Sequence, residues 1–500
     1  MTVPADDPLS DDPAALRALV RELRAELAAE RAVRLALQDR LDQLLRRLYG
    51  PTSEKLAPAG SGDTAVSLDA PAEPASEPTT TRTTRGHGRK RLPRELPRRR
   101  VIHDLTDAEK ACPCCHTVRT RIGEEVAERL DYTPASLFVV EHVRPKYACP
   151  ACRAHVVVAP PHPEPLPKAV AAPGLLAHVA TAKFADHLPL YRLERILARH
   201  GVELSRATMC DWLAGCAAAL KPIYDEMCAR VRSSKVVHTD DTPVRVRAGA
   251  SDRPRTGRIW VYVGDAANPY VVYDATASRS RDGPHAFLKG FKGFVQADAF
   301  GGYDGLYATG ATEVACWAHA RRKFVDARDS DATLSREALA LIGRLYGVER
   351  RAKDLTRDDR RAVRQHESAP VLRALDAWVR ATRARVLPKS PLGQALTYAT
   401  NQWAALNVYA TDGDLAIDNN AAERALRGIA VGRKNWLFWG SMAGGQTAAV
   451  LTSMVATCAR HGIDPWSYLA DVLARIPSHP ADRIAELLPD AWARAQHATS

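Results

Sequence analysis

The chain has 500 residues, ten cysteines and a formal net charge of +12 at pH 7. This length predicts several domains, and the positive charge predicts a polyanionic partner. No stretch reads as a signal peptide or membrane anchor, which favours DNA over a membrane as the partner and a cytoplasmic location. Residues 441–459 are uncharged, but their glycine, serine and threonine content favours a helix packed inside the protein.

Apolar residues near the start of the chain recur at alternating spacings of four and three, from Leu16 to Leu48, with a polar break at Glu30 and Arg34. This pattern predicts a coiled coil over residues 1–50, and with it a homo-oligomer. A single amphipathic helix folded onto its own domain is the alternative.

Residues 51–100 are predicted to form a linker. Its first part has few apolar residues that could join a core, and its second part is basic. The basic run includes Arg89, Lys90 and Arg91. Such a run can be a solvated tether, but we favour contact with DNA phosphates.

Two C-x-x-C pairs lie within residues 101–160. Each pair can aim two thiolates at one ion, and four thiolates complete a closed structural Zn²⁺ site in a zinc-ribbon-like module. The predicted ligands are Cys112, Cys115, Cys149 and Cys152. Cys114 is a spare thiol that complicates the choice of ligands, and four thiols without metal are the alternative.

Residues 161–230 predict helices, with a turn at residues 200–203 and Ser205 as the N-cap of the next helix. This is a helix-turn-helix arrangement, in which Arg206 and Thr208 would reach base edges. Helical hairpins also occur in many folds without contacting DNA.

Strand patterns begin after residue 235, and Asp240 and Asp298 end the first and fourth of them. Three consecutive strands, followed by strands alternating with helices, are the order of a ribonuclease-H-like mixed sheet. In that sheet the first and fourth strands are neighbours, so the two acids would face each other. Asp241 competes with Asp240 for the inward position, and Asp298 could instead cap a helix beginning near residue 301. The predicted strands cover residues 236–239, 259–263, 270–273, 293–297 and 313–315.

The fold class is therefore α/β and multi-domain, with a catalytic core divided by an all-helical insertion. A small helical domain follows. The predicted bounds are 231–325 and 413–460 for the two parts of the core, 326–412 for the insertion and 461–500 for the last domain.

The second part of the core contains Glu423 early on a predicted helix, with Asp418 as its N-cap and Arg427 one turn further along. Taken alone, Glu423 could be a surface acid. The predicted phosphate contacts of this helix and the segment after it are Arg424, Arg427, Arg433 and Lys434. Trp436 or Trp439 could stack on an unpaired base, or both could pack in the core.

Cutting or joining a phosphodiester requires an activated oxygen and relief of charge on the phosphate. Two Mg²⁺ (or Mn²⁺) ions supply both, and carboxylates hold them. Asp240, Asp298 and Glu423 have the residue types that such a site needs.

The chain resembles the insertion-sequence-66 family of DDE transposases over nearly all its length. The matching motifs are residues 48–50 and 53–56, the two cysteine pairs with 144–147, and 187–192, 238–243, 296–298, 316–324 and 418–427. Members of this family typically have Glu where this chain has Asp241. Cys316 and His319 resemble a C-x-x-H signature of several transposase families, for which we expect a structural role.

The resemblance implies a ribonuclease-H-like domain with Asp240, Asp298 and Glu423 as metal-binding triad. It also implies inverted-repeat DNA ends and target DNA as substrates, two small accessory proteins encoded nearby, and a place at the bacterial nucleoid. A domesticated or silent DNA-binding protein, and a structure-selective nuclease on the same fold, are the alternatives.

Overall fold

The computed structural model describes residues 137–142, 146–147, 157–158, 163–167, 169–247 and 255–499. All of them belong to the second of two compact units, Asp131–Ser500. The predicted coiled coil, the basic linker and the four predicted zinc ligands lie outside these residues. From the predicted zinc-ribbon-like module, the structure describes β1 (Lys146–Tyr147), which pairs with β2 (Val157–Val158) in antiparallel orientation.

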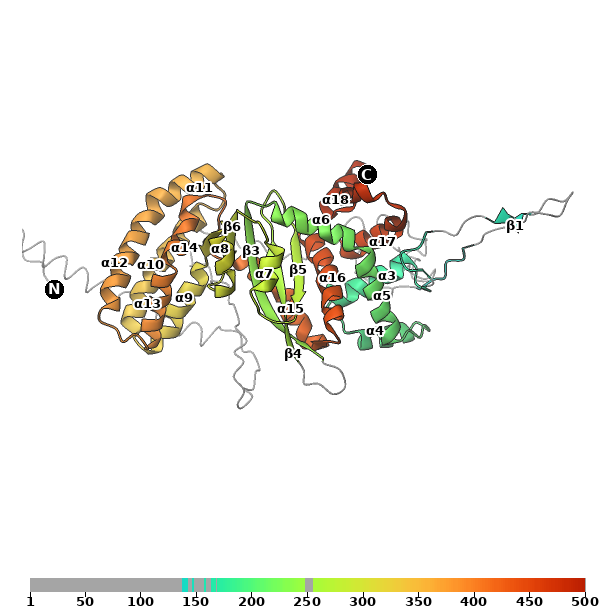
Figure 1. The fold of residues 1–500 in the computed structure, drawn as a ribbon, viewed down its shortest axis with the longest axis horizontal. Coiled ribbons are helices and arrows are strands. Elements are labelled where there is room, and N and C mark those ends of the chain that lie inside the picture. The colour runs from blue at the N-terminus through green and yellow to red at the C-terminus, as the bar shows by residue number, and fades with distance from the viewer. Residues whose placement is uncertain are drawn as a thin grey trace, which may run out of the picture. The chain divides into compact units, whose positions relative to one another are not determined.

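A mixed sheet lies at the centre of the described chain (Figure 1). Its main path has the order β5-β4-β3-β6-β7. The neighbours β3, β4 and β5 are antiparallel, whereas β6 and β7 continue parallel to β3. The first and fourth strands are therefore adjacent, as predicted. The strands are β3 (Val236–Val246), β4 (Arg255–Val263), β5 (Val271–Thr276), β6 (Phe294–Ala297) and β7 (Thr312–Ala315).

Strand β3 is longer than the sequence predicts. Asp240 is expected to end it, but the strand continues to Val246, paired with β4 and, at its far end, with β8 (Phe438–Trp439). Strand β6 ends at Ala297, so the second half of β3 is not paired with β6. Pro243, which has no backbone N–H to donate, lies in that half. Asp240 is thus a mid-strand residue near the point where β6 ends.

Within the described residues, four helices precede the sheet, and their apolar faces join a core that also covers one sheet face. Ser205 is the N-cap of α5, as predicted, and accepts a hydrogen bond from the Thr208 backbone N–H at 3.1 Å. The turn before it contains Gly201, whose φ of 77° lies in the left-handed region that glycine adopts readily. The helices are α3 (Pro173–Phe184), α4 (Leu190–Ala198), α5 (Arg206–Ala219) and α6 (Lys221–Arg232).

The free edge of β5 is covered by helix α16 (Met442–Arg460), as Figure 1 shows. Ser453 accepts a hydrogen bond from the Tyr273 backbone N–H at 2.8 Å, and Thr457 accepts one from Val271 at 3.1 Å. Polar side chains thus satisfy backbone groups that a neighbouring strand would otherwise bind. The expected interior helix is present, and its hydroxyl content follows from this role.

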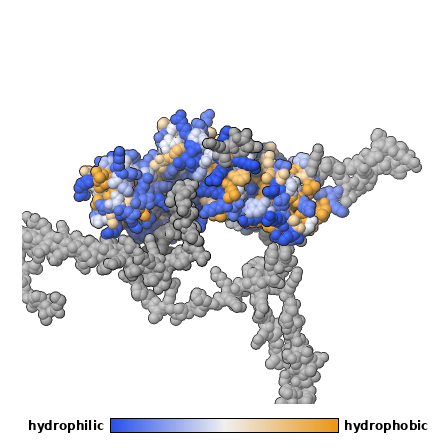
Figure 2. Space-filling view, turned by 90° about the horizontal axis from the view of Figure 1, so that it is seen from below, coloured by the Kyte–Doolittle hydropathy of each residue, from blue (hydrophilic) through white to orange (hydrophobic). Residues whose placement is uncertain are grey.

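No helix in the described part of the chain is long and apolar enough to cross a membrane. Figure 2 shows a mostly hydrophilic face on which apolar residues form separate patches.

The chain between β7 and Asp412 is helical and builds a second core. Within it, the Arg364 side chain is 1% exposed, and its guanidinium lies 2.6 Å from the Glu349 carboxylate. Helix α14 packs against β7, so this helical segment borders the sheet on the side opposite α16 (Figure 1). Its main helices are α9 (Trp317–Asp326), α10 (Ala332–Arg351), α11 (Arg357–Val363), α12 (Ala369–Arg383), α13 (Pro391–Asn401) and α14 (Trp403–Val408).

The last described helices pack back on the first ones. Helix α17 (Pro465–Arg475) contacts α3, and α18 (Pro489–Thr499) follows a short 3₁₀ segment that contacts α6. The carboxylate of Asp464 caps α17 by accepting from the Ser467 backbone N–H at 2.8 Å.

Candidate active site

Two of the predicted catalytic acids come from neighbouring parallel strands. The register pairs His238 of β3 with Gln296 of β6, and Asp240 and Asp298 each lie two residues further along. Equal steps along parallel strands keep side chains on the same face, so this register brings the two carboxylates together. The Asp298 side chain is 25% exposed, which leaves it accessible.

Glu423 reaches the same region from helix α15 (Asn420–Trp436). It lies in the first turn, where a carboxylate suits the positive end of the helix dipole, and its side chain is 13% exposed. The apolar residues Ala422, Leu426 and Ile429 pack the helix against the face of the sheet formed by alternate residues of β3, β4 and β5. This packing fixes the helix, and therefore Glu423, beside β3.

The start of α15 is attached to β3 by Asn419, which is fully buried. Its side-chain amide donates to the Thr239 carbonyl at 2.9 Å, and its Oδ1 lies 3.2 Å from His238 Nδ1. Its backbone N–H donates to the Cys316 sulfur at 3.2 Å. Asn419 therefore sets the distance between the strand that carries Asp240 and the helix that carries Glu423.

The charges of the other acids act on Asp240. Burial, and to a smaller extent the carboxylates of Asp298, Asp241 and Glu423, raise the pKa of Asp240 to about 7. A hydrogen bond from the Asp241 backbone N–H at 2.7 Å opposes this rise. Asp240 thus sits where additional negative charge is unfavourable.

Asp241 has different surroundings from Asp240. Its side chain is 1% exposed, and its carboxylate binds Arg258 at 2.9 Å and Arg279 at 2.8 Å. Asp241 is therefore neutralised by two arginines, whereas Asp240 forms no ion pair with any described residue.

Arg279 is a site residue that the sequence analysis missed. Its guanidinium also lies 3.3 Å from the Asp298 carboxylate and 4.1 Å from the centre of the Phe300 ring. It lies beyond the end of β5, and no motif marks it. Asp298 does not cap the following 3₁₀ turn, which has Phe300 at its N-cap position. The Asp298 carboxylate contacts Arg279 instead.

Cys316 and His319 lie beside Glu423. One ligand atom of each of these three residues falls within 4.8 Å of the others, and His319 Nδ1 is 3.8 Å from Glu423 Oε1. The Nδ1 atom is buried without a hydrogen-bond partner in the described structure. Burial raises the pKa of the Cys316 thiol to about 12, so it remains protonated. His319 is thus the better candidate for an added ligand, and the C-x-x-H spacing was the signal for it.

Asp418 supplies the capping hydrogen bond of α15, as predicted, although the N-cap position itself falls one residue later than expected. Asn419 occupies that position, and Asp418 precedes it. The Asp418 carboxylate accepts from the Asn420 backbone N–H at 3.2 Å and from the Tyr346 hydroxyl at 3.2 Å. Asp418 thereby joins the helix start to α10 of the helical segment.

The predicted DNA contacts have different surroundings. Arg424, Arg427 and Lys434 are exposed. Arg433 instead donates to the Thr242 hydroxyl and the Pro243 carbonyl, both at 2.8 Å, and so holds α15 against β3.

The predicted helix-turn-helix residues are on the surface of α5, where Arg206 is 66% exposed and lies 3.4 Å from Glu194. The Thr208 hydroxyl is 2.9 Å from that of Ser205. Both side chains therefore have local partners.

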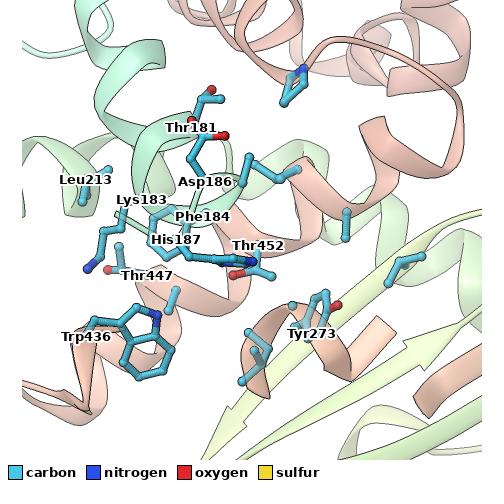
Figure 3. Close-up of a pocket in the computed structure, with 18 of the residues that line it drawn as sticks. Thr181, Lys183, Phe184, Asp186, His187, Leu213, Tyr273, Trp436, Thr447 and Thr452 are labelled. Carbon is cyan, nitrogen blue, oxygen red and sulfur yellow. The ribbon is translucent and has the colours of Figure 1, made fainter. Parts of the chain in front are cut away.

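The two candidate stacking residues separate clearly. Trp439 is 6% exposed and packs in the core under α16, which excludes it from stacking on DNA. Trp436 is only partly buried and lines a groove (Figure 3).

Comparison with known proteins identifies the family of the chain. Residues 168–447 match the family described as "Transposase IS66 family". Three further matches are to the zinc-finger binding domain of transposase IS66 at 109–153, the IS66 C-terminal element at 453–489, and "Transposase C of IS166 homeodomain" at 36–101.

Similar proteins of Sinorhizobium fredii (strain NBRC 101917 / NGR234) extend the comparison. The uncharacterized protein y4hP is 35% identical over 93% of this chain and 90% of its own length. The uncharacterized protein y4jD is 36% identical over 80% of this chain and 81% of its own. These matches define a transposase. The chain belongs to the IS66 transposase family.

Proposed function

We propose that this transposase cleaves DNA strands at the ends of an insertion sequence and joins them to target DNA, with Asp240, Asp298 and Glu423 as its catalytic triad. The observation that carries the proposal is the register that sets Asp240 and Asp298 at equivalent positions of neighbouring parallel strands, with the charge of Glu423 on α15 also acting on Asp240. Like charges held near one another raise the free energy of the folded state unless a cation offsets them. Such a cluster therefore favours a functional role for these acids.

The donor set fits hard divalent ions. Carboxylate oxygens are preferred ligands of Mg²⁺ and Mn²⁺, and the unpartnered Nδ1 of His319 lies beside Glu423. When bound, two such ions would activate the attacking oxygen and offset the charge that develops on the phosphate.

The chain's own residues position the reaction. Asn419 fixes Glu423 relative to β3 through its bond to Thr239. Exposed Arg424, Arg427 and Lys434 would bind phosphates and orient the strand along α15.

We assign the catalytic domain to the ribonuclease-H-like class because of its strand order and strand directions. The other regions of the chain have roles in the same proposal. The coiled coil would pair protomers, a Zn²⁺ module and the α4–α5 pair would hold the inverted-repeat ends, and accessory proteins would assist.

The test is Mg²⁺-dependent cleavage of DNA carrying the sequences that flank the gene, with the accessory proteins supplied. Asp240→Asn, Asp298→Asn and Glu423→Gln should each reduce cleavage at least a hundredfold. Asp304→Asn is the matched control, because this exposed acid lies on a neighbouring helix, α8 (Asp304–Ala308), and should leave cleavage unchanged. Wild-type cleavage activity in these three variants would refute the assignment of the three acids as the catalytic triad. An inactive wild-type protein that still binds these ends would favour a silent DNA-binding protein.

A further inference from the structure

A groove of about 1270 Å³ lies between the helices that precede the sheet and the pair α15 and α16. It is separate from the acid cluster, and neither the motifs nor the proposed chemistry accounts for it. Helix α16 lines it from Ala443 to Arg460, which is roughly 25 Å at about 1.5 Å per residue. The groove is therefore elongated enough to hold several residues of a polymer.

The walls combine aromatic rings with small residues. Figure 3 shows Lys183, Thr447 and Trp436 gathered at one end, with Phe184 and His187 beside them. Room for two of the rings comes from Gly432 of α15. A Cβ at that position would lie 2.7 Å from Trp436 Nε1 and 3.2 Å from His187 Nδ1. The Trp436 ring thus lies against Gly432 of its own helix and contributes to the wall of the groove.

Three cations line the groove, namely Lys183, Arg424 and Arg460. None of them forms an ion pair with a carboxylate within the described ranges. Burial lowers the pKa of Lys183, and burial together with the nearby charge of Arg424 lowers that of Arg460. Lys183 is partly buried, which favours an anionic group beside it, whereas Arg424 and Arg460 are exposed. The Asp265 carboxylate acts on the pKa of Arg460 against the effect of burial, and the Arg460 guanidinium donates to the Gly264 carbonyl at 3.2 Å.

Three acids also line the groove, Asp186, Asp211 and Asp464, and all of them are exposed. The Asp464 carboxylate is already engaged in capping α17. At Lys183 and Trp436, which lie at the same end, the groove offers a partly buried cation and an aromatic face together, a combination suited to nucleotides.

The groove also has a defined relation to the triad. Ala421, Ala425 and Gly428 line it and are spaced by four and three residues, so they share one face of α15. Glu423 is two residues after Ala421, about 200° around the helix, and so faces the other way. Arg424 lies between the two faces. A strand leaving the acids would meet Arg424 and then enter the groove.

We propose that this groove binds single-stranded DNA, with Lys183, Arg424 and Arg460 on its phosphates and Trp436 against a base. The inference rests on the proposed function for the identity of the strand, which would be the segment next to the cleaved bond. Duplex DNA does not fit, because its bases are stacked and cannot reach Trp436.

The test uses the full chain in EDTA, so that no cleavage occurs. Fluorescence anisotropy measures binding of a labelled 12-nucleotide oligothymidylate and of a labelled random 24-base-pair duplex. The Lys183→Gln/Arg424→Gln double variant should bind the single strand about tenfold more weakly. Its slope of log affinity against log salt should be shallower by roughly 1.4, at about 0.7 per phosphate contact. Trp436→Ala should also weaken binding about tenfold.

The matched control is Lys389→Gln/Arg373→Gln, which removes two exposed cations from the helical segment. It should leave single-strand and duplex binding unchanged, and Trp436→Ala should change duplex binding less than twofold. In the double variant, duplex binding should fall less than single-strand binding, because Arg424 can also contact duplex phosphates. Melting temperatures close to that of the wild type establish that the groove variants fold. Unchanged single-strand binding in the groove variants, or equal loss on the duplex, would overturn the proposal. Failure of the wild-type protein to bind the oligonucleotide would also overturn the proposal, and would leave a peptide or a segment of this chain as the occupant of the groove.

Asp240→Asn separates this inference from the proposed function. The residue does not line the groove, so its variant should bind oligothymidylate like the wild type while losing cleavage. Retained cleavage in that variant would refute the triad without affecting the result for the groove.

Discussion

Asp240 and Asp241 are consecutive residues of β3, yet their carboxylates have opposite environments. Asp241 is held by Arg258 and Arg279, whereas Asp240 is crowded by other acids. Alternation along the strand causes this difference, because neighbouring side chains project to opposite faces. The structure thus separates two residues that the sequence alone does not: Asp241 forms ion pairs with two arginines, and Asp240 forms none with any described residue and remains available for the proposed chemistry.

Asp241→Asn should lower stability. Removing one partner from a buried ion pair costs about 3 kcal/mol or more, and the cost here should fall near the low end because both arginines remain partly exposed. Thermal unfolding should show a clear fall in melting temperature, with Asp304→Asn as the unaffected control. An unchanged melting temperature would mean that the arginines find other partners.

The metal-free protein should lose stability as pH rises from about 4 to about 7. The Asp240 carboxyl ionises near 3.8 when unfolded but holds its proton to about 7 when folded, so the folded state binds more protons across this window. Asp240→Asn removes that loss, and its melting temperature should exceed that of the wild type more at pH 8 than at pH 5. The gap corresponds to a few kcal/mol, at about 1.4 kcal/mol per pKa unit. Equal gaps at both pH values would contradict it.

Arg279→Gln should tighten the binding of Mn²⁺ several-fold. Arg279 lies on the Asp298 carboxylate, and a divalent ion has to compete with its positive charge. Isothermal titration calorimetry measures the change. Arg281→Gln, which alters an exposed arginine two residues away, is the control and should behave like the wild type. Weaker binding in Arg279→Gln would show instead that the guanidinium positions Asp298.

His319→Ala should weaken Mn²⁺ binding about tenfold and Mg²⁺ binding much less. Nitrogen ligands favour Mn²⁺ relative to Mg²⁺, which prefers oxygen. Titration of each metal, with Mn²⁺ followed by electron paramagnetic resonance, tests this difference. Exposed His366 on the helical segment provides the control substitution. Equal losses for both ions would assign His319 a role in positioning Glu423 only.

Ser453→Ala should destabilise the edge of the sheet. The Tyr273 backbone N–H would lose its partner while remaining buried, at a cost of about 1–3 kcal/mol. Thr452→Val is the comparison, because no hydrogen bond of the Thr452 side chain is found in the described structure. Hydrogen exchange at Tyr273 should accelerate in Ser453→Ala alone. Unaltered exchange would mean that another group covers this N–H.

The order of the strands was predictable because each strand pattern is local and the crossover rules leave few arrangements. That order was enough to bring Asp240 next to Asp298. The extension of β3 to Val246 was not predicted, and its last two residues pair with β8, nearly two hundred positions later in the chain. Arg279 and Asn419 were missed because each acts through contacts between distant segments. The start of α15 was predicted one residue early, because Asp418 and Asn419 are both good capping residues.

The pairing of β8 with β3 and the cover that α16 provides for β5 have a consequence for synthesis. A nascent chain that has reached Asp412 contains two of the acids, but the last two residues of β3 and the edge of β5 still lack their later partners. The same late segment that completes the sheet also delivers Glu423. A truncated product would therefore lack the third acid and a finished fold at once, which couples catalytic competence to completion of the chain.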